Sequence, residues 1–152
     1  MLSKEIIKIK YNISSNNYEI SILREKIKNL DNEREKYLKE LKDLVVDKNY
    51  KDKCFTCTEG VYSSDEFCIR CGWLKCSWCK SCGCNYGSSR VNKKYKNILK
   101  SNSEAKILKE KIEQIYEKKS LYNGNCNKMI NENDLFKKKL KQFVKLGVKN
   151  ET

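Results

Sequence analysis

Apolar residues recur along the first fifty residues at alternating steps of four and three. Eleven of the thirteen positions in this series are apolar or aromatic, and the register is unbroken for six heptads. The series is Leu2, Ile6, Ile9, Ile13, Asn16, Ile20, Leu23, Ile27, Leu30, Arg34, Tyr37, Leu41 and Leu44. A heptad pattern sustained for this length predicts a coiled-coil helix over residues 1–48.

The residue types in this series also predict how the helix pairs. Isoleucine occupies most of the a positions and leucine most of the d positions, a combination that favours a parallel two-stranded coil. Asn16 and Arg34 are the two polar seam positions, and such residues fix register at some cost in stability.

A second heptad series follows in the last third of the chain. Its apolar members are Val91, Ile98, Ala105, Leu108, Ile112, Ile115, Tyr122, Cys126, Met129, Phe136, Leu140 and Phe143. Its polar interruptions are Lys94, Ser101, Lys119 and Asn133. The pattern predicts a second coiled-coil helix over 91–146, capped by Ser88 or Ser89. The turn-type triplet at 123–125 predicts a kink or loosened turn and not a hairpin, since the register continues across it.

Eight cysteines lie between the two predicted helices, in a segment that we place at residues 54–86. They read Cys54-x2-Cys57-x10-Cys68-x2-Cys71-x4-Cys76-x2-Cys79-x2-Cys82-x-Cys84. Three Cys-x2-Cys pairs and one Cys-x-Cys pair provide two sets of four thiolates, the ligand count of two closed tetrahedral zinc sites. Such sites leave no open coordination position, so they build structure and do not catalyse.

The spacing leaves more than one pairing of the cysteines open. We expect sequential pairing, with the first four cysteines on one zinc ion and the last four on the other, because only two residues separate Cys79 from Cys82. The alternative is a cross-braced pairing that interleaves the pairs, as RING-type modules do. An iron–sulfur cluster is a further alternative, since Cys76, Cys79 and Cys82 match the first three ligands of a ferredoxin-type run. Cys84 comes too soon to be the fourth.

Charge adds a candidate partner. The 152 residues carry a formal net charge of +13, which falls to +9 when eight thiolates hold two zinc ions. Residues 91–152 hold 16 basic and 7 acidic groups, so the positive charge is concentrated in the last third. The candidate nucleic-acid contacts are lysines of the densest basic segment and the tryptophans of the cysteine-rich segment: Lys137, Lys138, Lys141, Lys145, Trp73 and Trp78. The alternative is a solvated helix surface and a module whose aromatic residues form its core.

The remaining residues argue against catalysis and against secretion. The chain has no histidine to activate a thiol, so we expect Cys126, at a seam position, to be a buried apolar residue. No signal peptide, membrane span or lipidation motif is visible, which predicts an intracellular protein of the cytoplasm or nucleus. Four arginines provide little base readout, so any RNA or DNA binding should be mostly non-specific.

These observations predict a mainly α protein in which two long heptad-patterned helices flank a small all-cysteine double zinc module with short knuckles and hairpins. We expect a non-enzymatic protein without a small-molecule substrate, acting in regulation or assembly around nucleic acid, as a homodimer or with a partner coiled-coil helix. A pure protein-interaction or structural component with a zinc-stabilised junction is the first alternative. An iron–sulfur protein is the second.

Overall fold

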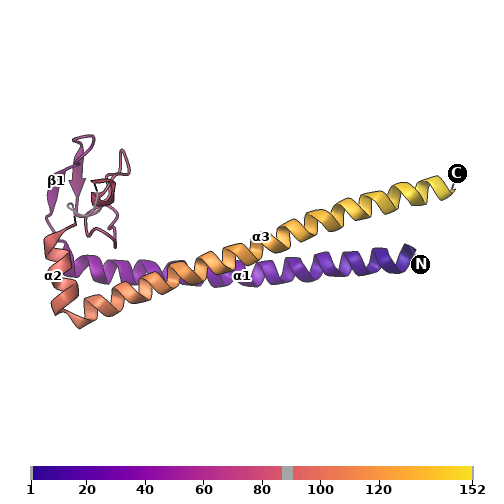
Figure 1. The fold of residues 1–152 in the computed structure, drawn as a ribbon, viewed down its shortest axis with the longest axis horizontal. Coiled ribbons are helices and arrows are strands. Elements are labelled where there is room, and N and C mark those ends of the chain that lie inside the picture. The colour runs from indigo at the N-terminus through magenta and orange to yellow at the C-terminus, as the bar shows by residue number, and fades with distance from the viewer. Residues whose placement is uncertain (1, 87–90, 152) are drawn as a thin grey trace. The chain divides into compact units, whose positions relative to one another are not determined.

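The structure, a computed structural model, describes residues 2–86 and 91–151 and is mainly helical, with two long helices flanking the cysteine-rich region (Figure 1). Its elements are α1 (Leu2–Val45), β1 (Lys51–Lys53), β2 (Gly60–Tyr62), the short 3-10 helix η1 (Gly83–Tyr86), α2 (Lys93–Ser101) and α3 (Ser103–Glu151). The chain forms two compact units, which we describe separately. The helix-pair unit comprises residues 1–31 and 116–152, and the metal-module unit comprises 32–115. None of the helices in the described ranges is long and apolar enough to cross a membrane.

In the helix-pair unit, α1 and α3 run antiparallel. Asn16 Nδ2 donates to Asn133 Oδ1 at 3.0 Å, and Asp31 pairs with Lys119. As the residue number rises along α1, the partner's number falls along α3. The expectation of a parallel coil was therefore wrong. The chain reverses between its two heptad series, so each series finds its partner helix in the same molecule.

The burial of the side chains confirms both heptad series. Of the thirteen positions in the first series, only Leu2 is exposed, at 37%. All twelve apolar positions of the second series are buried or half-buried, and Cys126 is buried as expected. The hydrophobic pattern thus identified positions that the structure buries wholly or in part, with Leu2 as the exception.

A polar layer interrupts the seam of the helix-pair unit. Asn133 is only 4% exposed, accepts a hydrogen bond from Asn16 and donates one to Asn17 Oδ1 at 3.0 Å. Asn16 Nδ2 also approaches Glu132 at 3.4 Å. Because a buried amide is costly when unpaired, this layer disfavours any register that separates the three asparagines.

The break in the second helical segment lies at Asn102 and not at 123–125. Asn102 is extended (φ −115°, ψ 108°), ends α2 by donating its N–H to Ile98 O, and starts α3 by accepting the Ala105 N–H on Oδ1 at 3.1 Å. Helix α3 continues through Gly124. The predicted 91–146 helix is therefore two helices, and the first helix ends at Val45 instead of residue 48. The predicted caps Ser88 and Ser89 lie outside the described residues, and the N-cap of α2 is Asn92.

The metal-module unit has one apolar core shared by its helices and its cysteine-rich segment. Leu41 and Val45 come from the end of α1, Tyr95 from α2, and Ile112 from the start of α3. The cysteine-rich segment contributes a further set to the same core: Cys54, Val61, Phe67, Ile69, Leu74 and Cys76. The module is therefore packed against three helices, and burial of this apolar surface favours that arrangement.

Candidate metal centre

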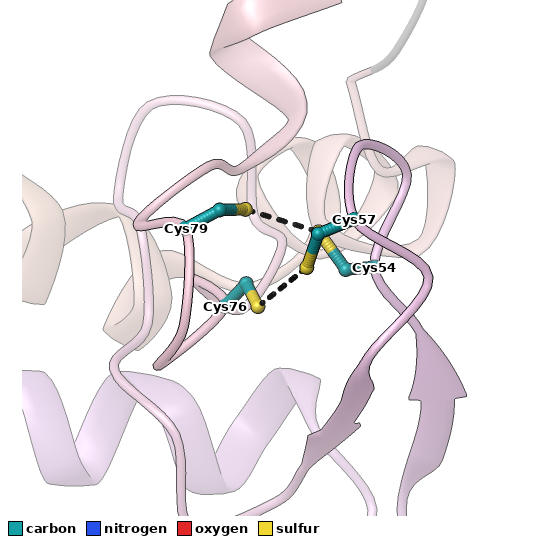
Figure 2. Close-up of side chains that lie close together, drawn as sticks. All are labelled: Cys54, Cys57, Cys76 and Cys79. Atoms are coloured by element: carbon teal, nitrogen blue, oxygen red, sulfur yellow. Dashed lines mark hydrogen bonds between the residues drawn. The ribbon is translucent and has the colours of Figure 1, made fainter.

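The eight cysteines form two groups of four, and in each group all four sulfur atoms lie within 4.8 Å of one another. Site 1 consists of Cys54, Cys57, Cys76 and Cys79. Site 2 consists of Cys68, Cys71, Cys82 and Cys84. Figure 2 shows the sulfur atoms of two Cys-x2-Cys turns of site 1 facing one another, with 3.5 Å between the Sγ atoms of Cys54 and Cys79.

The pairing is cross-braced, so the expectation of sequential pairing was wrong. Cys79 belongs to site 1 and Cys82 to site 2, although only two residues separate them. The sequence-based expectation was that two intervening residues are too few for the chain to pass from one site to the other. Three residue steps of extended chain nevertheless span about 10 Å, which is enough to move from one four-sulfur cluster to the next.

Three turns of the module share one backbone design. In each Cys-x2-Cys turn, the first cysteine donates its N–H to the carbonyl five residues later, and the residue four positions later donates back to that cysteine's carbonyl. The residues four positions after the first cysteine of each turn are Thr58, Gly72 and Lys80, and all three have a positive φ, between 62° and 73°. This left-handed residue closes the turn and lets both sulfur atoms point to the same side.

Short antiparallel pairs support two of these turns. Strands β1 and β2 flank the Cys54–Cys57 turn, with Lys53 paired to Gly60. An isolated bridge between Phe67 and Leu74 flanks the Cys68–Cys71 turn. The last pair, Cys82 and Cys84, lies at the start of η1, where the Cys82 N–H is held by Asn85 Oδ1 at 3.1 Å.

The sulfur positions fit a single tetrahedral ion. Four sulfurs placed about 2.3 Å from a central zinc lie about 3.8 Å apart. Sulfur atoms from different turns lie 3.5 Å and 3.6 Å apart in site 1 and 3.7 Å apart in site 2, far longer than the ~2.05 Å of a disulfide. A cluster of several iron and sulfide ions needs more space than four sulfurs within 4.8 Å enclose. The ferredoxin-like run is also divided, because Cys82 lies in the other site. Both groups can hold one metal ion each.

Proton affinities within the two sites are unequal, as expected where thiols share protons. A hydrogen bond from Cys71 lowers the pKa of Cys68 to about 4, and a hydrogen bond from Ser81 lowers the pKa of Cys79 to about 6. The pKa of Cys71 is raised by its hydrogen bond to Cys68 and by burial, and desolvation raises the pKa of Cys84. Each site therefore contains a stabilised thiolate, the form that binds metal.

Site 1 also contains a thiol that resists ionisation. A backbone hydrogen bond involving Glu59 lowers the pKa of Cys57, but desolvation and hydrogen bonding to Cys76 outweigh it and raise the pKa to about 12. A bound cation would reverse that preference by favouring the thiolate.

Helix α2 holds the Cys68–Cys71 turn directly. The Tyr95 hydroxyl donates to Ile69 O at 2.6 Å, and the Tyr95 ring meets Phe67 edge to face at 5.4 Å. Asn92 donates its backbone N–H to Cys71 O at 2.8 Å and its side-chain amide to Gly72 O at 2.9 Å. Site 2 is thus fixed to the N-terminal end of α2 by hydrogen bonds as well as by packing.

The two tryptophans have different environments. Trp73 is half-buried, packs against the cysteines of site 2 and contacts Phe55 edge to face at 5.7 Å. Trp78, inside the Cys76–Cys79 turn, is 76% exposed. Of the two, Trp78 is the side chain that a partner can reach.

The four candidate lysines all lie on α3 in the helix-pair unit, and all are exposed: Lys137, Lys138, Lys141 and Lys145. Trp73 and Trp78 lie in the metal-module unit. The candidate contacts therefore fall on two separately described units.

Sequence reasoning missed Tyr95 and Asn92 as supports of the metal module. Tyr95 sits between lysines and outside the heptad series, so its almost complete burial had no pattern to predict it. Asn92 carried a usable signal, since asparagine is a strong N-cap residue just before a helical segment.

Comparison with known proteins does not assign this site. No family model matches the chain, and no curated protein or solved structure matches it significantly. The functional conclusion therefore rests on the residues themselves.

Proposed function

We propose that the protein is a non-enzymatic scaffold, stabilised by two structural zinc ions, that acts in regulation or assembly around nucleic acid inside the cell. Two observations support the zinc assignment. The all-cysteine ligand sets are of the kind found in structural zinc sites, and the sulfur spacing matches a tetrahedral ion. A closed four-thiolate site gives zinc no open position for a substrate, which supports the non-enzymatic role.

The observation that carries the nucleic-acid part is the exposure of the α3 lysines. Lys137, Lys141 and Lys145 follow one another at four-residue steps, so they form a stripe along one side of the helix. Ammonium groups in such a row can follow a phosphate backbone without reading bases. We leave Trp73 out of the proposed contacts because it packs within the module, and keep Trp78.

A salt titration of the zinc-loaded protein tests this function. We expect affinity for a labelled RNA or DNA oligonucleotide to fall steeply and linearly with salt on a logarithmic plot, with a slope that reflects several neutralised phosphates. Failure to bind either nucleic acid at low salt would contradict the proposal.

The exposed Trp78 favours one second candidate, a pure protein-interaction component. A large aromatic side chain on a turn made rigid by a metal is typical of the residues that dominate protein interfaces. In that case the lysines serve solubility alone. Substituting Trp78 by alanine would then abolish capture of the protein partner, and the wild-type protein would bind neither RNA nor DNA at low salt.

A further inference from the structure

The net positive charge of the helix-pair unit is concentrated at one end. We call residues 2–12 of α1 and 136–147 of α3 the basic end. It holds one acidic residue, Glu5, and eight lysines: Lys4, Lys8, Lys10, Lys137, Lys138, Lys139, Lys141 and Lys145. Residues 13–31 and 116–135 of the same unit hold six basic and six acidic side chains, which balance.

The antiparallel pairing brings the lysines of both chain ends together. Counting outward from the Asn16–Asn133 contact places Lys8 and Lys10 level with residues 139–141 of α3. Lys8 and Lys139 line the same cleft, of about 340 Å³, between the two helices. In Figure 1, the first turns of α1 and the last turns of α3 lie at the same end of the helix pair. Sequence reasoning assigned the positive charge to the last third alone and missed the three N-terminal lysines.

These lysines are exposed, and Glu5, which lines the cleft with Lys8 and Lys139, cannot balance eight of them within the described part of the protein. The ion pairs identified there involve other cations, such as Lys119 with Asp31 and Lys94 with Asp47. Like charges at the same level on facing helices repel one another, and an anion relieves that repulsion. The basic end therefore favours a ligand that carries several negative charges in a row.

The apolar side chains at this end favour a nucleic acid over a lipid surface. Membrane-surface helices present a continuous apolar face to the lipid. Here the side chains of Ile9 and Phe143 lie at the cleft between the two helices instead. Four aliphatic side chains at this end are exposed: Leu2, Ile7, Val144 and Leu146. Val144 and Leu146 are two positions apart and point to nearly opposite sides of α3, and Leu2 and Ile7 point about 140° apart on α1. Ile7 shares its face with Tyr11 and with lysines, so neither helix presents a continuous apolar face.

The ring of Tyr11 favours a single-stranded nucleic acid over a duplex. Tyr11 is 71% exposed and lies within three residues of Lys8 and Lys10. An exposed aromatic ring among lysines is the combination that single-strand binders use, since unpaired bases stack on the ring while ammonium groups hold the phosphates.

We propose that the basic end is one composite site for single-stranded nucleic acid, built jointly by the first three turns of α1 and the last turns of α3. This inference rests on the proposed function and adds to it the N-terminal lysines and Tyr11. It predicts that lysines of both chain ends contribute to binding.

The test measures binding of labelled polyuridine RNA to the full-length, zinc-loaded protein over a range of salt concentrations. The variants are an N-terminal pair, Lys8→Gln with Lys10→Gln, and a C-terminal pair, Lys137→Gln with Lys141→Gln. The matched control, Lys36→Gln with Lys39→Gln, removes the same charge from exposed positions of α1 in the metal-module unit. Each basic-end pair should make the salt slope shallower by about 1.4, at about 0.7 for each phosphate that is no longer neutralised, and the control pair should leave it unchanged.

Separate outcomes distinguish this inference from the proposed function. If only the C-terminal pair weakens binding, the composite site is wrong and the proposed function stands. If the wild-type protein binds neither this RNA nor DNA of either strandedness at low salt, both fail. Preference for duplex over single strands, or binding to phosphatidylserine vesicles in place of RNA, would also overturn the inference. The Tyr11→Ala variant should weaken RNA binding without changing the salt slope, because stacking releases no counterions.

Discussion

The ring of Tyr95 lies so close to Gly72 that a Cβ placed on the glycine would come within 2.4 Å of Tyr95 Cδ1. Gly72 also has a φ of +73°, which side chains other than glycine adopt only at a cost. The left-handed positions of the other two turns carry Thr58 and Lys80. Glycine is therefore required at position 72 for two reasons: the turn needs a positive φ there, and helix α2 packs directly on that turn.

Substituting Gly72 by alanine should destabilise the zinc-loaded protein by about 3 kcal/mol, combining left-handed strain of about 1–2 kcal/mol with overpacking against Tyr95. Urea unfolding measures the change. Gly124→Ala is the matched control, because a Cβ at that helical position meets nothing within 4 Å. The control should stabilise the protein by about 1 kcal/mol. Equal effects at the two glycines would contradict the packing of α2 on the turn.

The polar layer of the helix pair should be sensitive to the loss of one amide. Asn133→Ala removes the hydrogen bonds of Asn133 to Asn16 and Asn17 and should cost about 1–3 kcal/mol of unfolding free energy. Asn127→Ala, at an exposed position of the same helix, should be neutral or slightly stabilising, since alanine is the better helix former. Thermal unfolding of both variants checks this, and a stable Asn133→Ala protein would show that the layer contributes nothing.

The intramolecular helix pair predicts a monomer. Both heptad series find a partner helix within the chain, so neither series needs a second copy to cover its apolar positions. This prediction differs from the homodimer that the heptad series alone favoured, and a mass measurement decides between them. Light scattering on the zinc-loaded protein should give the mass of one chain, 17.9 kDa plus metal, across a range of concentrations. A mass of two chains would mean that the helices pair between molecules.

Heptad periodicity predicted the fold well because packing between helices depends on a repeat that a single sequence displays. It could not predict orientation, since the same a and d positions serve parallel and antiparallel pairs until a contact such as Asn16 with Asn133 fixes one of them. Cysteine spacing gave all eight members of the two clusters. The grouping depends instead on which turns face each other in the folded chain, and cysteine spacing does not display that arrangement.

Acidification should release metal from site 2 steeply. Zinc binds thiolates, and the raised pKa of Cys71 and Cys84 means that both sulfurs hold protons at neutral pH until metal displaces them. Displacing these two protons makes the zinc affinity fall at least about 100-fold for each unit of pH lost. Cys68, with a pKa of about 4, adds a further proton only in more acidic solution. Competition with a zinc indicator at several pH values measures this slope, and a flat profile near neutral pH would contradict it.

The cross-braced pairing is the central claim, and metal counting by native mass spectrometry on two double variants tests it most directly. The variant Cys54→Ser with Cys76→Ser removes two ligands from site 1 only, so it should retain one zinc ion in site 2. The variant Cys54→Ser with Cys68→Ser removes one ligand from each site and should retain none. Sequential pairing gives the opposite result, with no zinc in the first variant and one in the second, and that outcome would contradict the account.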